Sequence, residues 1–278
     1  MNGKFFAAMT LAATLLITGC GGGDKPADKP ADGDKAAKEV TLKIGATPVP
    51  HSEILAEIKD DLKAKGITLE VVEFNDYVQP NIALNDKELD ANFFQHEPYL
   101  NDFIKEHKDV KLKNAGGVHI EPMGIYSKKI KDLKDLSDGA TVSIPNDPTN
   151  GGRALLLLQK AELLKLKDGV NEMATVQDIA ENPKNLKIQE VEAAQLPRTL
   201  EDVDISIINT NFAMNADLNP MKDALFIEDK TSPYVNIIAV REGDENREEI
   251  KTLLNTIKTD KVKKFLEEKY KGAIVPAF

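Results

Sequence analysis

Ile144-Pro-Asn-Asp-Pro-Thr-Asn-Gly-Gly-Arg-Ala-Leu-Leu-Leu-Leu-Gln159 joins a β-rich run to an apolar helix. The run ends at Ile144, a Pro/Asn/Gly turn follows, and we expect the helix to start near Arg153. A helix N-terminus at the carboxyl end of a strand favours an anion, because unpaired N–H groups and the helix dipole point outward there. Gly151 and Gly152 would let a ligand approach the backbone, and the Arg153 guanidinium suits a carboxylate. The alternative is an ordinary strand-to-helix connection with a surface arginine.

Composition places the chain among soluble globular proteins. It has 278 residues, of which 41% are hydrophobic and 29% charged, and this length suits two domains of ordinary size. The 46 acidic side chains outnumber the 36 basic ones and give a formal net charge of −10, which argues against a nucleic-acid partner. The single cysteine excludes a disulfide framework or a cysteine zinc site within the monomer.

The N-terminus looks like the export signal of a bacterial lipoprotein. A mostly apolar run over residues 5–17 is too short to span a bilayer, and Leu16-Ile-Thr-Gly-Cys20 ends it as a lipobox does. We therefore expect a signal peptide over residues 1–19 and lipidation of Cys20 after cleavage. Residues 20–39 should be a flexible tether, because their Gly, Asp, Lys, Pro and Ala residues offer little apolar surface to bury. The alternatives are a plain secretory signal with an incidental cysteine, or a cytosolic helix.

Beyond the tether, runs typical of strands alternate with runs typical of helices. This alternation predicts an α/β fold with largely parallel sheets that helices cover on both faces. The expected strands are 40–44, 67–74, 89–94, a run from 110, 140–144, 186–191, 204–208 and 234–240. The expected helices are 52–66, a short one near 82–84, 98–107, 150–164, 194–201, one from 211, 246–257 and 260–270.

Two breaks interrupt the alternation, one at the glycines and prolines of residues 116–126 and one near residues 230–236. We interpret them as crossings, at which the chain leaves a first lobe and later returns to it. The first lobe would comprise residues 40–122 and 234–278, and the second lobe residues 123–233. A ligand would then sit in a cleft between the lobes, at the carboxyl ends of strands.

Aromatic side chains follow strand ends in the first lobe. Phe94 ends a strand, and His96 and Tyr99 come where that strand passes into a helix. Tyr77 lies in a similar connection. Taken singly, Phe94 is typical of a core residue. The apolar bodies and polar tips of His96 and Tyr99 suit the wall of a partly apolar pocket.

Amide side chains occupy comparable places in the second half. Asn209 and Asn211 follow a buried strand, and Asn236 lies inside the apolar run of residues 235–238. Their amides could donate to a carboxylate or cap a turn, and a buried Asn236 needs either a backbone partner or a ligand.

Signatures of enzymes are incomplete. His96-Glu97 begins like a zincin motif, but Leu100 stands where the second histidine belongs. His119-Ile-Glu121 begins like a zinc deaminase motif whose cysteine half is missing. Neither a P-loop nor a G-x-S-x-G elbow occurs. We therefore expect no enzyme activity, no catalytic residues, no metal site and no cofactor.

Six ordered motifs resemble the methionine-binding lipoproteins of ABC methionine importers. The resemblance covers residues 40–278, and the N-terminal signal matches too. It implies the type II, two-lobed fold of periplasmic binding proteins with the ligand cleft between the lobes. The motifs are Phe74-Asn-Asp-Tyr-Val-Gln-Pro-Asn81, Asp90 to Tyr99, Pro145 to Arg153, Asn182-Pro-Lys-Asn-Leu-Lys187, Ile208-Asn-Thr210 and Ser232-Pro-Tyr-Val-Asn236.

By this resemblance the protein captures methionine, with L-methionine as the first expectation, and delivers it to a membrane permease. Arg153 should hold the α-carboxylate, and Asn209 and Asn236 should bind the amino-acid backbone. Asn211 is left as a ligand contact or a cap. The residues that should enclose the thioether are Tyr77, Phe94, His96 and Tyr99.

The resemblance also implies the partners and the location of the protein. The partners would be an ABC permease with its ATPase subunit. The protein would be a monomer, anchored to the membrane by its lipid on the extracytoplasmic side. Alternatives that stay open are D-methionine, a methionine-containing dipeptide, and an adhesin or structural module on the same fold.

Overall fold

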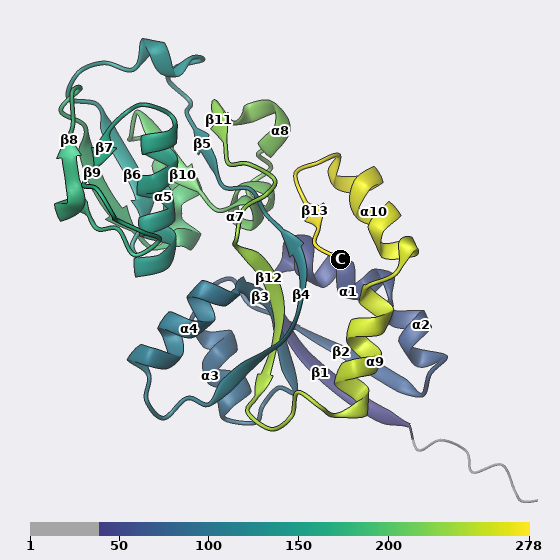
Figure 1. Ribbon diagram of the computed structural model, residues 1–278. Coiled ribbons are helices and arrows are strands. Elements are labelled where there is room, and N and C mark those ends of the chain that lie inside the picture. The colour runs from purple at the N-terminus through teal and green to yellow at the C-terminus, as the bar shows by residue number, and fades with distance from the viewer. Residues whose placement is uncertain (1–38) are drawn as a thin grey trace, which may run out of the picture. The chain divides into compact units, whose positions relative to one another are not determined.

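Two β-sheets organise residues 39–278, the part of the chain that the computed structural model describes (Figure 1). The predicted signal peptide, the lipidated Cys20 and nearly all of the tether lie outside the described residues. The first sheet has the strand order β13-β4-β12-β3-β1-β2 and the second β11-β5-β10-β6-β9. Strands β7 (Lys165–Leu166) and β8 (Ile179–Glu181) pair separately.

Both sheets collect strands from distant parts of the chain. The first contains β1 (Val40–Ala46), β2 (Ile67–Glu73), β3 (Ala91–His96), β4 (Leu112–Ile120), β12 (Val235–Arg241) and β13 (Val275–Pro276). The second contains β5 (Gly124–Tyr126), β6 (Thr141–Pro145), β9 (Lys187–Val191), β10 (Ile205–Ile208) and β11 (Phe226–Ile227).

Helices pack against both sheets. Those beside the first sheet are α1 (Glu53–Glu57), α2 (Lys59–Lys63), α3 (Gln79–Asn85), α4 (Glu97–Glu106), α9 (Glu248–Ile257) and α10 (Asp260–Tyr270). Those beside the second are α5 (Pro148–Lys160), α6 (Leu196–Thr199), α7 (Thr210–Asn215) and α8 (Pro220–Asp223). No helix within residues 39–278 has the length and apolar character that crossing a membrane requires.

Strand β12 shows why helices cover both faces of the first sheet. Ile238 and Val240 pack into a core shared with α1, α2, α9 and α10, whereas Ile237 and Ala239 pack into a second core under α3 and α4. Successive side chains of a strand point to opposite faces, so an unbroken apolar strand needs a cover on each side. Figure 1 shows α3 and α4 on one side of this sheet and α1, α2 and α9 on the other.

The sheets are mixed, and the prediction of largely parallel sheets is wrong for five of the nine strand pairs in the two sheets. Strand β1 pairs in parallel with β2 and β3, but β12 runs antiparallel to β3 and β4. In the second sheet, β5 is antiparallel to β10 and β11, while β6 is parallel to β9 and β10. The reason lies in the path of the chain: β4 leads out of the first sheet and β12 leads back, so these neighbours run in opposite directions.

The chain passes between the sheets twice, at residues 121–123 and 228–234. Both passages lie within or beside the predicted breaks, but Gly116 and Gly117 belong to β4 instead of interrupting it. A Cβ on Gly117 would lie 2.8 Å from Cγ1 of Val235 on β12. Glycine is therefore required there by the close approach of two strands and does not mark a turn.

Candidate functional site

One cavity lies between side chains of the two sheets, and it brings together all seven residues that the sequence predicts for ligand binding. The space that no atom fills between the lining side chains, open solvent at the mouth included, is about 330 Å³. The lining residues are Tyr77, Phe94, Gln95, His96, Tyr99, Glu121, Asn150, Arg153, Asn209, Thr210, Asn211 and Asn236.

Helix α5 positions Arg153, although it starts earlier than the sequence suggests. It begins at Pro148 instead of near Arg153, because Asp147 caps it: the Asp147 carboxylate accepts from the Asn150 N–H at 2.9 Å. Gly152 therefore lies inside the helix, and its role differs from the predicted approach of a ligand. A Cβ on Gly152 would lie 2.1 Å from the backbone oxygen of Glu172, so the residue lets the helix pack against that loop.

The Arg153 guanidinium is buried and partly occupied by protein groups. Nε donates to Oε1 of Glu228 at 3.1 Å, and Nη2 donates to the other Glu228 carboxylate oxygen and, at 2.7 Å, to the backbone oxygen of Glu121. The guanidinium carbon lies 4.2 Å from the centre of the Tyr234 ring. Of the three guanidinium nitrogens of Arg153, only Nη1 has no hydrogen-bond or ion-pair partner within residues 39–278. A ligand anion could therefore bind at the Nη1 edge.

The aromatic side chains turn apolar surface toward the cavity because the protein satisfies their polar tips. The Tyr77 hydroxyl donates to Oδ1 of Asn211 at 2.6 Å, and the Tyr99 hydroxyl donates to the Tyr77 backbone oxygen at 3.0 Å. The Tyr77 ring lies 5.8 Å from Phe94 and 5.7 Å from Tyr99, centre to centre. These rings form a connected apolar wall.

His96 belongs to that wall as a neutral imidazole. Its Nδ1 accepts from the Tyr99 N–H at 3.2 Å, so Nε2 carries the hydrogen and donates to Oδ1 of Asn150 at 3.1 Å. Burial lowers the pKa of His96 to about 3, with the Arg153 charge as a further cause, so the ring is uncharged at neutral pH.

Two buried amides in the cavity wall each leave one polar atom without a hydrogen-bond partner among residues 39–278. Asn211 accepts from Tyr77 through Oδ1, and its Nδ2 has no partner. Asn209 donates through Nδ2 to Oδ1 of Asn150 at 2.9 Å, and its Oδ1 has no partner. Buried polar atoms are nearly always paired, so this donor and this acceptor point to a polar ligand.

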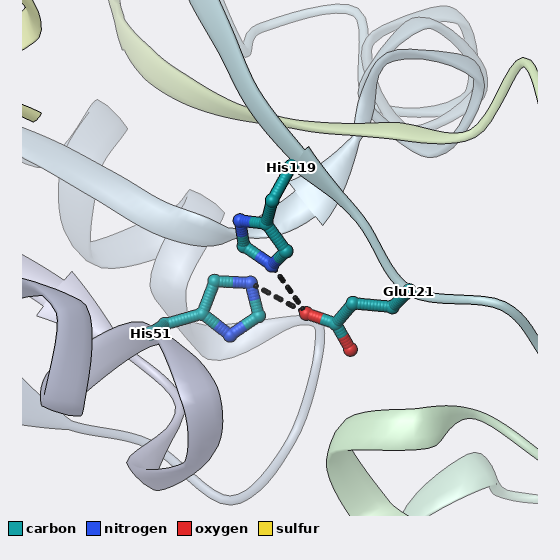
Figure 2. Close-up of side chains that lie close together, drawn as sticks. All are labelled: His51, His119 and Glu121. Carbon is teal, nitrogen blue, oxygen red and sulfur yellow. Dashed lines mark hydrogen bonds and ion pairs between the residues drawn. The ribbon is translucent and has the colours of Figure 1, made fainter. Parts of the chain in front are cut away.

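Glu121 is the lining residue of most chemical interest that sequence reasoning missed. It is 6% exposed, and Oε1 lies 2.8 Å from Nε2 of His119 and 3.2 Å from Nε2 of His51 (Figure 2). Burial raises the pKa of the Glu121 carboxyl, and the nearby His51 and Arg153 lower it in part. In the sequence, His119 and Glu121 stand out only as an incomplete zinc deaminase motif, but their spacing of two residues at the end of a strand places them on the same face.

Asn236 connects this group to the predicted site. Its Oδ1 lies 3.1 Å from Nε2 of His51, and the residue lies on β12 opposite both His96 and His119. The structure therefore places Asn236 in the cavity wall with a side-chain partner, His51, which is neither the backbone partner nor the ligand that the sequence suggests for this buried amide.

Comparisons with known proteins give one consistent answer. The family model described as NlpA lipoprotein matches residues 42–278. The methionine-binding lipoprotein MetQ of Bacillus subtilis (strain 168) is 43% identical in an alignment of 280 positions that covers 99% of each chain. The D-methionine-binding lipoprotein MetQ of Escherichia coli (strain K12) is 43% identical over 276 residues, covering 98% of this chain and 97% of that protein.

A solved structure extends the agreement to the fold. The nutrient-binding protein from Burkholderia cenocepacia, bound to methionine, is 49% identical and superposes with a TM-score of 0.82 over 85% of this chain and all of the other. The mixed α/β architecture is thus the two-lobed fold of substrate-binding proteins, as predicted. With the family model matched from β1 to the last residue, the chain belongs to the NlpA lipoprotein family.

Proposed function

We propose that the protein captures methionine in the cavity between its lobes and delivers it to the membrane permease of an ABC importer. Relatives named for methionine binding support this at 43% identity over nearly the whole chain, and so does the related structure bound to methionine. The lobes in this proposal are residues 40–122 with 234–278, and residues 123–233. The protein acts by binding and release, without catalysis.

The observation that carries the proposal is that one cavity is lined both by polar groups in need of partners and by an aromatic wall. The polar groups are the Nη1 edge of Arg153 and, without a partner among residues 39–278, Nδ2 of Asn211 and Oδ1 of Asn209. The hydroxyl groups of Tyr77 and Tyr99 in the aromatic wall are already bonded within the protein. A free amino acid with a long apolar side chain matches both kinds of lining.

In this proposal the ligand carboxylate lies at the Nη1 edge of Arg153 and accepts from Nδ2 of Asn211. Asn209 and Asn236 bind the amino-acid backbone. The thioether lies against Tyr77, Phe94, His96 and Tyr99, where contact between sulfur and an aromatic ring contributes about 0.3–1.5 kcal/mol. An adhesin or a structural module would need no such cavity.

The experiment that tests the proposal is identification of the ligand. Mass spectrometry of small molecules released from purified, denatured protein should detect methionine. Calorimetry on the emptied protein should then rank L-methionine, D-methionine, a methionine-containing dipeptide and norleucine, which replaces sulfur with a methylene group. Failure to bind any methionine derivative would contradict the proposal, and preference for D-methionine or the dipeptide would change the substrate within it.

The proposal includes a lipid anchor at Cys20, an extracytoplasmic location, an ATPase-driven permease as partner and a monomeric protein. Lipoproteins among the relatives support the anchor, and so does the lipobox-like Leu16 to Cys20. Replacing Cys20 with alanine should move the protein from the membrane fraction to the soluble fraction. Retention of the Cys20→Ala protein in membranes would show that another feature anchors it.

A further inference from the structure

We propose that Glu121, held in place by His51 and His119, forms an ammonium-binding subsite that restricts the cavity to ligands with a free, positively charged amino group. The inference rests on the proposed function, because it assumes that this cavity is the ligand site. It adds a role for three residues that the methionine proposal does not use. Figure 2 shows how the two imidazole rings converge on one carboxylate oxygen.

The hydrogen bonds of His51 show which of its ring nitrogens carries a hydrogen. Its Nε2 faces Oε1 of Glu121 at 3.2 Å and Oδ1 of Asn236 at 3.1 Å. A carboxylate oxygen and an amide oxygen are both acceptors, so Nε2 must carry the hydrogen. Nδ1 then accepts from the Thr47 hydroxyl at 2.6 Å. Because burial lowers the pKa of His51 to about 4, the ring is neutral, and its single N–H points at Glu121.

The same argument applies to His119. Its Nε2 lies 2.8 Å from Oε1 of Glu121, so it donates there too. Burial lowers the pKa of His51 to about 4 and that of His119 to about 3, which keeps both rings neutral at physiological pH. Two neutral ring donors therefore orient the Glu121 carboxyl group without adding a positive charge beside it, and the Asn211 backbone N–H is a further donor to it.

Position decides which of the three residues touches a ligand. Glu121 lines the cavity, whereas His51 and His119 lie behind it. Because both rings bind Oε1, the other oxygen, Oε2, is free of the two histidines. The unpartnered Oδ1 of Asn209 lines the same cavity. An ammonium group has only donors, so these two acceptors suit it.

Charge leads to the same conclusion. The one arginine that lines the cavity, Arg153, already forms a two-point ion pair with Glu228 and reaches only the backbone oxygen of Glu121. No lysine or arginine side chain within residues 39–278 forms an ion pair with the Glu121 carboxylate. A buried carboxylate without a cationic partner is costly, and a ligand ammonium would supply that partner.

The three side chains also offer one ligand atom each to a metal ion, within 4.8 Å of one another. The environment of Nδ1 of His119 argues against a metal ion at this site. A histidine that binds a metal normally donates its other N–H to a partner, but Nδ1 of His119 is buried without a partner in the part of the chain that the structure describes. A neutral ring leaves an acceptor unpaired at that position, which is better tolerated than an unpaired N–H.

The subsite makes ligand affinity depend on pH. The groups that face Glu121 are His51, His119 and Arg153, with Tyr77 and Tyr270 near enough to feel its charge; burial raises the pKa of both tyrosines, so they stay neutral. Protonating Glu121 removes the charge that binds the ammonium. Affinity for methionine should therefore fall as the solution is acidified through the raised pKa of Glu121.

The decisive experiment pairs a change in the protein with a change in the ligand. Calorimetry would compare methionine with 4-(methylthio)butanoate, which lacks the amino group, on wild-type protein and on Glu121→Gln. Methionine should bind Glu121→Gln at least about 30-fold more weakly, because one charge of a buried pair is lost. The affinity for 4-(methylthio)butanoate should stay the same or rise. Glu190→Gln, an exposed change on β9, should alter neither affinity.

Variants of His119 test its role as a positioning residue. His119→Phe removes a donor to the Glu121 carboxylate, so the fall of methionine affinity should move to higher pH and reach about tenfold at a pH where wild type is unaffected. His119→Gln keeps an N–H near the position of Nε2 and should restore a profile close to wild type. Thr47→Val, which removes the partner of His51, gives a second measurement should His119→Phe not fold.

The possible outcomes separate this inference from the proposed function. Wild-type protein that binds neither ligand would contradict the proposed function, and this inference would fall with it. Wild-type protein that binds methionine, with equal losses for both ligands in Glu121→Gln or with no loss, would overturn the subsite alone. Tight, stoichiometric zinc binding by wild type that His119→Phe abolishes would also overturn it in favour of a metal site.

Discussion

Arg153 illustrates how much of a residue's role depends on its partners. Sequence reasoning assigns its planar guanidinium to a ligand carboxylate, and the structure places it in the cavity wall, 3% exposed. Glu228, however, occupies the edge formed by Nε and Nη2. A ligand would meet an arginine already oriented by an ion pair, so binding would not require the side chain to be ordered afresh.

Replacing Arg153 with alanine should weaken methionine binding by roughly 2–5 kcal/mol, because a buried ligand charge loses its partner. Arg153→Lys should also bind worse than wild type, since a point charge cannot serve Glu228 and the ligand in the same planar geometry. Methionine methyl ester should be much weaker than methionine on wild type but only slightly weaker on Arg153→Ala. Calorimetry on the four combinations measures this coupling.

The exposed Arg198→Ala serves as the control for loss of an arginine elsewhere in the second lobe and should bind as wild type does. Strictly additive losses in the four combinations would mean that Arg153 acts on something other than the ligand carboxylate. It would then be a structural partner of Glu228 and not an anchor for the ligand.

Tyr77 offers a second test at this scale. Its hydroxyl fixes the amide of Asn211 so that Nδ2 faces the cavity. Tyr77→Phe keeps the aromatic wall but frees this amide, so methionine binding should weaken by about 0.5–1.5 kcal/mol. Tyr126→Phe is a matched control, because the buried Tyr126 hydroxyl has no partner and lies outside the cavity lining. Equal calorimetric affinities for Tyr77→Phe and wild type would dismiss the role of this hydrogen bond.

At the scale of elements, the start of α5 is a packing feature as much as a binding feature. The helix is capped by Asp147, and Gly152 lets its second turn pass within van der Waals distance of the loop at Glu172. Because Arg153 is the next residue, the packing of α5 against this loop also determines the position of Arg153 in the cavity wall. Gly152 therefore affects the site indirectly, through the position of the α5 backbone.

A methyl group at Gly152 should consequently destabilise the protein. The added Cβ would meet backbone atoms of Glu172, which cannot rotate away, so we expect Gly152→Ala to lower the free energy of unfolding by about 1–3 kcal/mol. Gly116→Ala is the comparison, since its Cβ would meet only the side-chain ends of Leu254 and Lys258. Urea unfolding of both variants measures the difference, and equal stabilities would contradict this account of α5.

At the scale of the whole molecule, direct contacts join the two lobes around the cavity. Tyr77 reaches Asn211, and His96 reaches Asn150, so side chains of the first sheet's connections bind those of the second. Two segments carry the backbone between the sheets, at residues 121–123 and 228–234. Glu121 and Glu228 belong to these segments. Residues at or next to the cavity therefore lie in the two connections about which the lobes would move relative to each other.

Methionine should therefore hold the lobes together. We expect saturating ligand to reduce the radius of gyration slightly in X-ray scattering. It should also slow amide hydrogen exchange at the cavity and in residues 121–123 and 228–234. A buried ligand that contacts both lobes adds to the free energy of opening them, which is the physical reason for both effects. Identical scattering and exchange with and without ligand would instead support a cavity that binds without closing.

Short-range patterns in the sequence sufficed for much of this protein. Apolar periodicity located most of the strands and helices, since residues two apart in a strand and three or four apart in a helix share a face. Residues at strand ends, together with the resemblance to methionine-binding lipoproteins, identified seven residues that line one cavity. Five strands, β5, β7, β8, β11 and β13, escaped this reasoning because two or three residues carry too little pattern to recognise.

Only the tertiary structure decided which groups meet. Glu228 binds Arg153 from 75 residues away, and Asn236 lies beside His51 across 185 residues. The antiparallel setting of β12 and the convergence of His51 and His119 on Glu121 depend on the same long-range folding. Local propensity contains no information about such pairs, because they form only when distant segments pack together. The sequence alone therefore determined the elements and the family resemblance, whereas packing decided the electrostatics of the site.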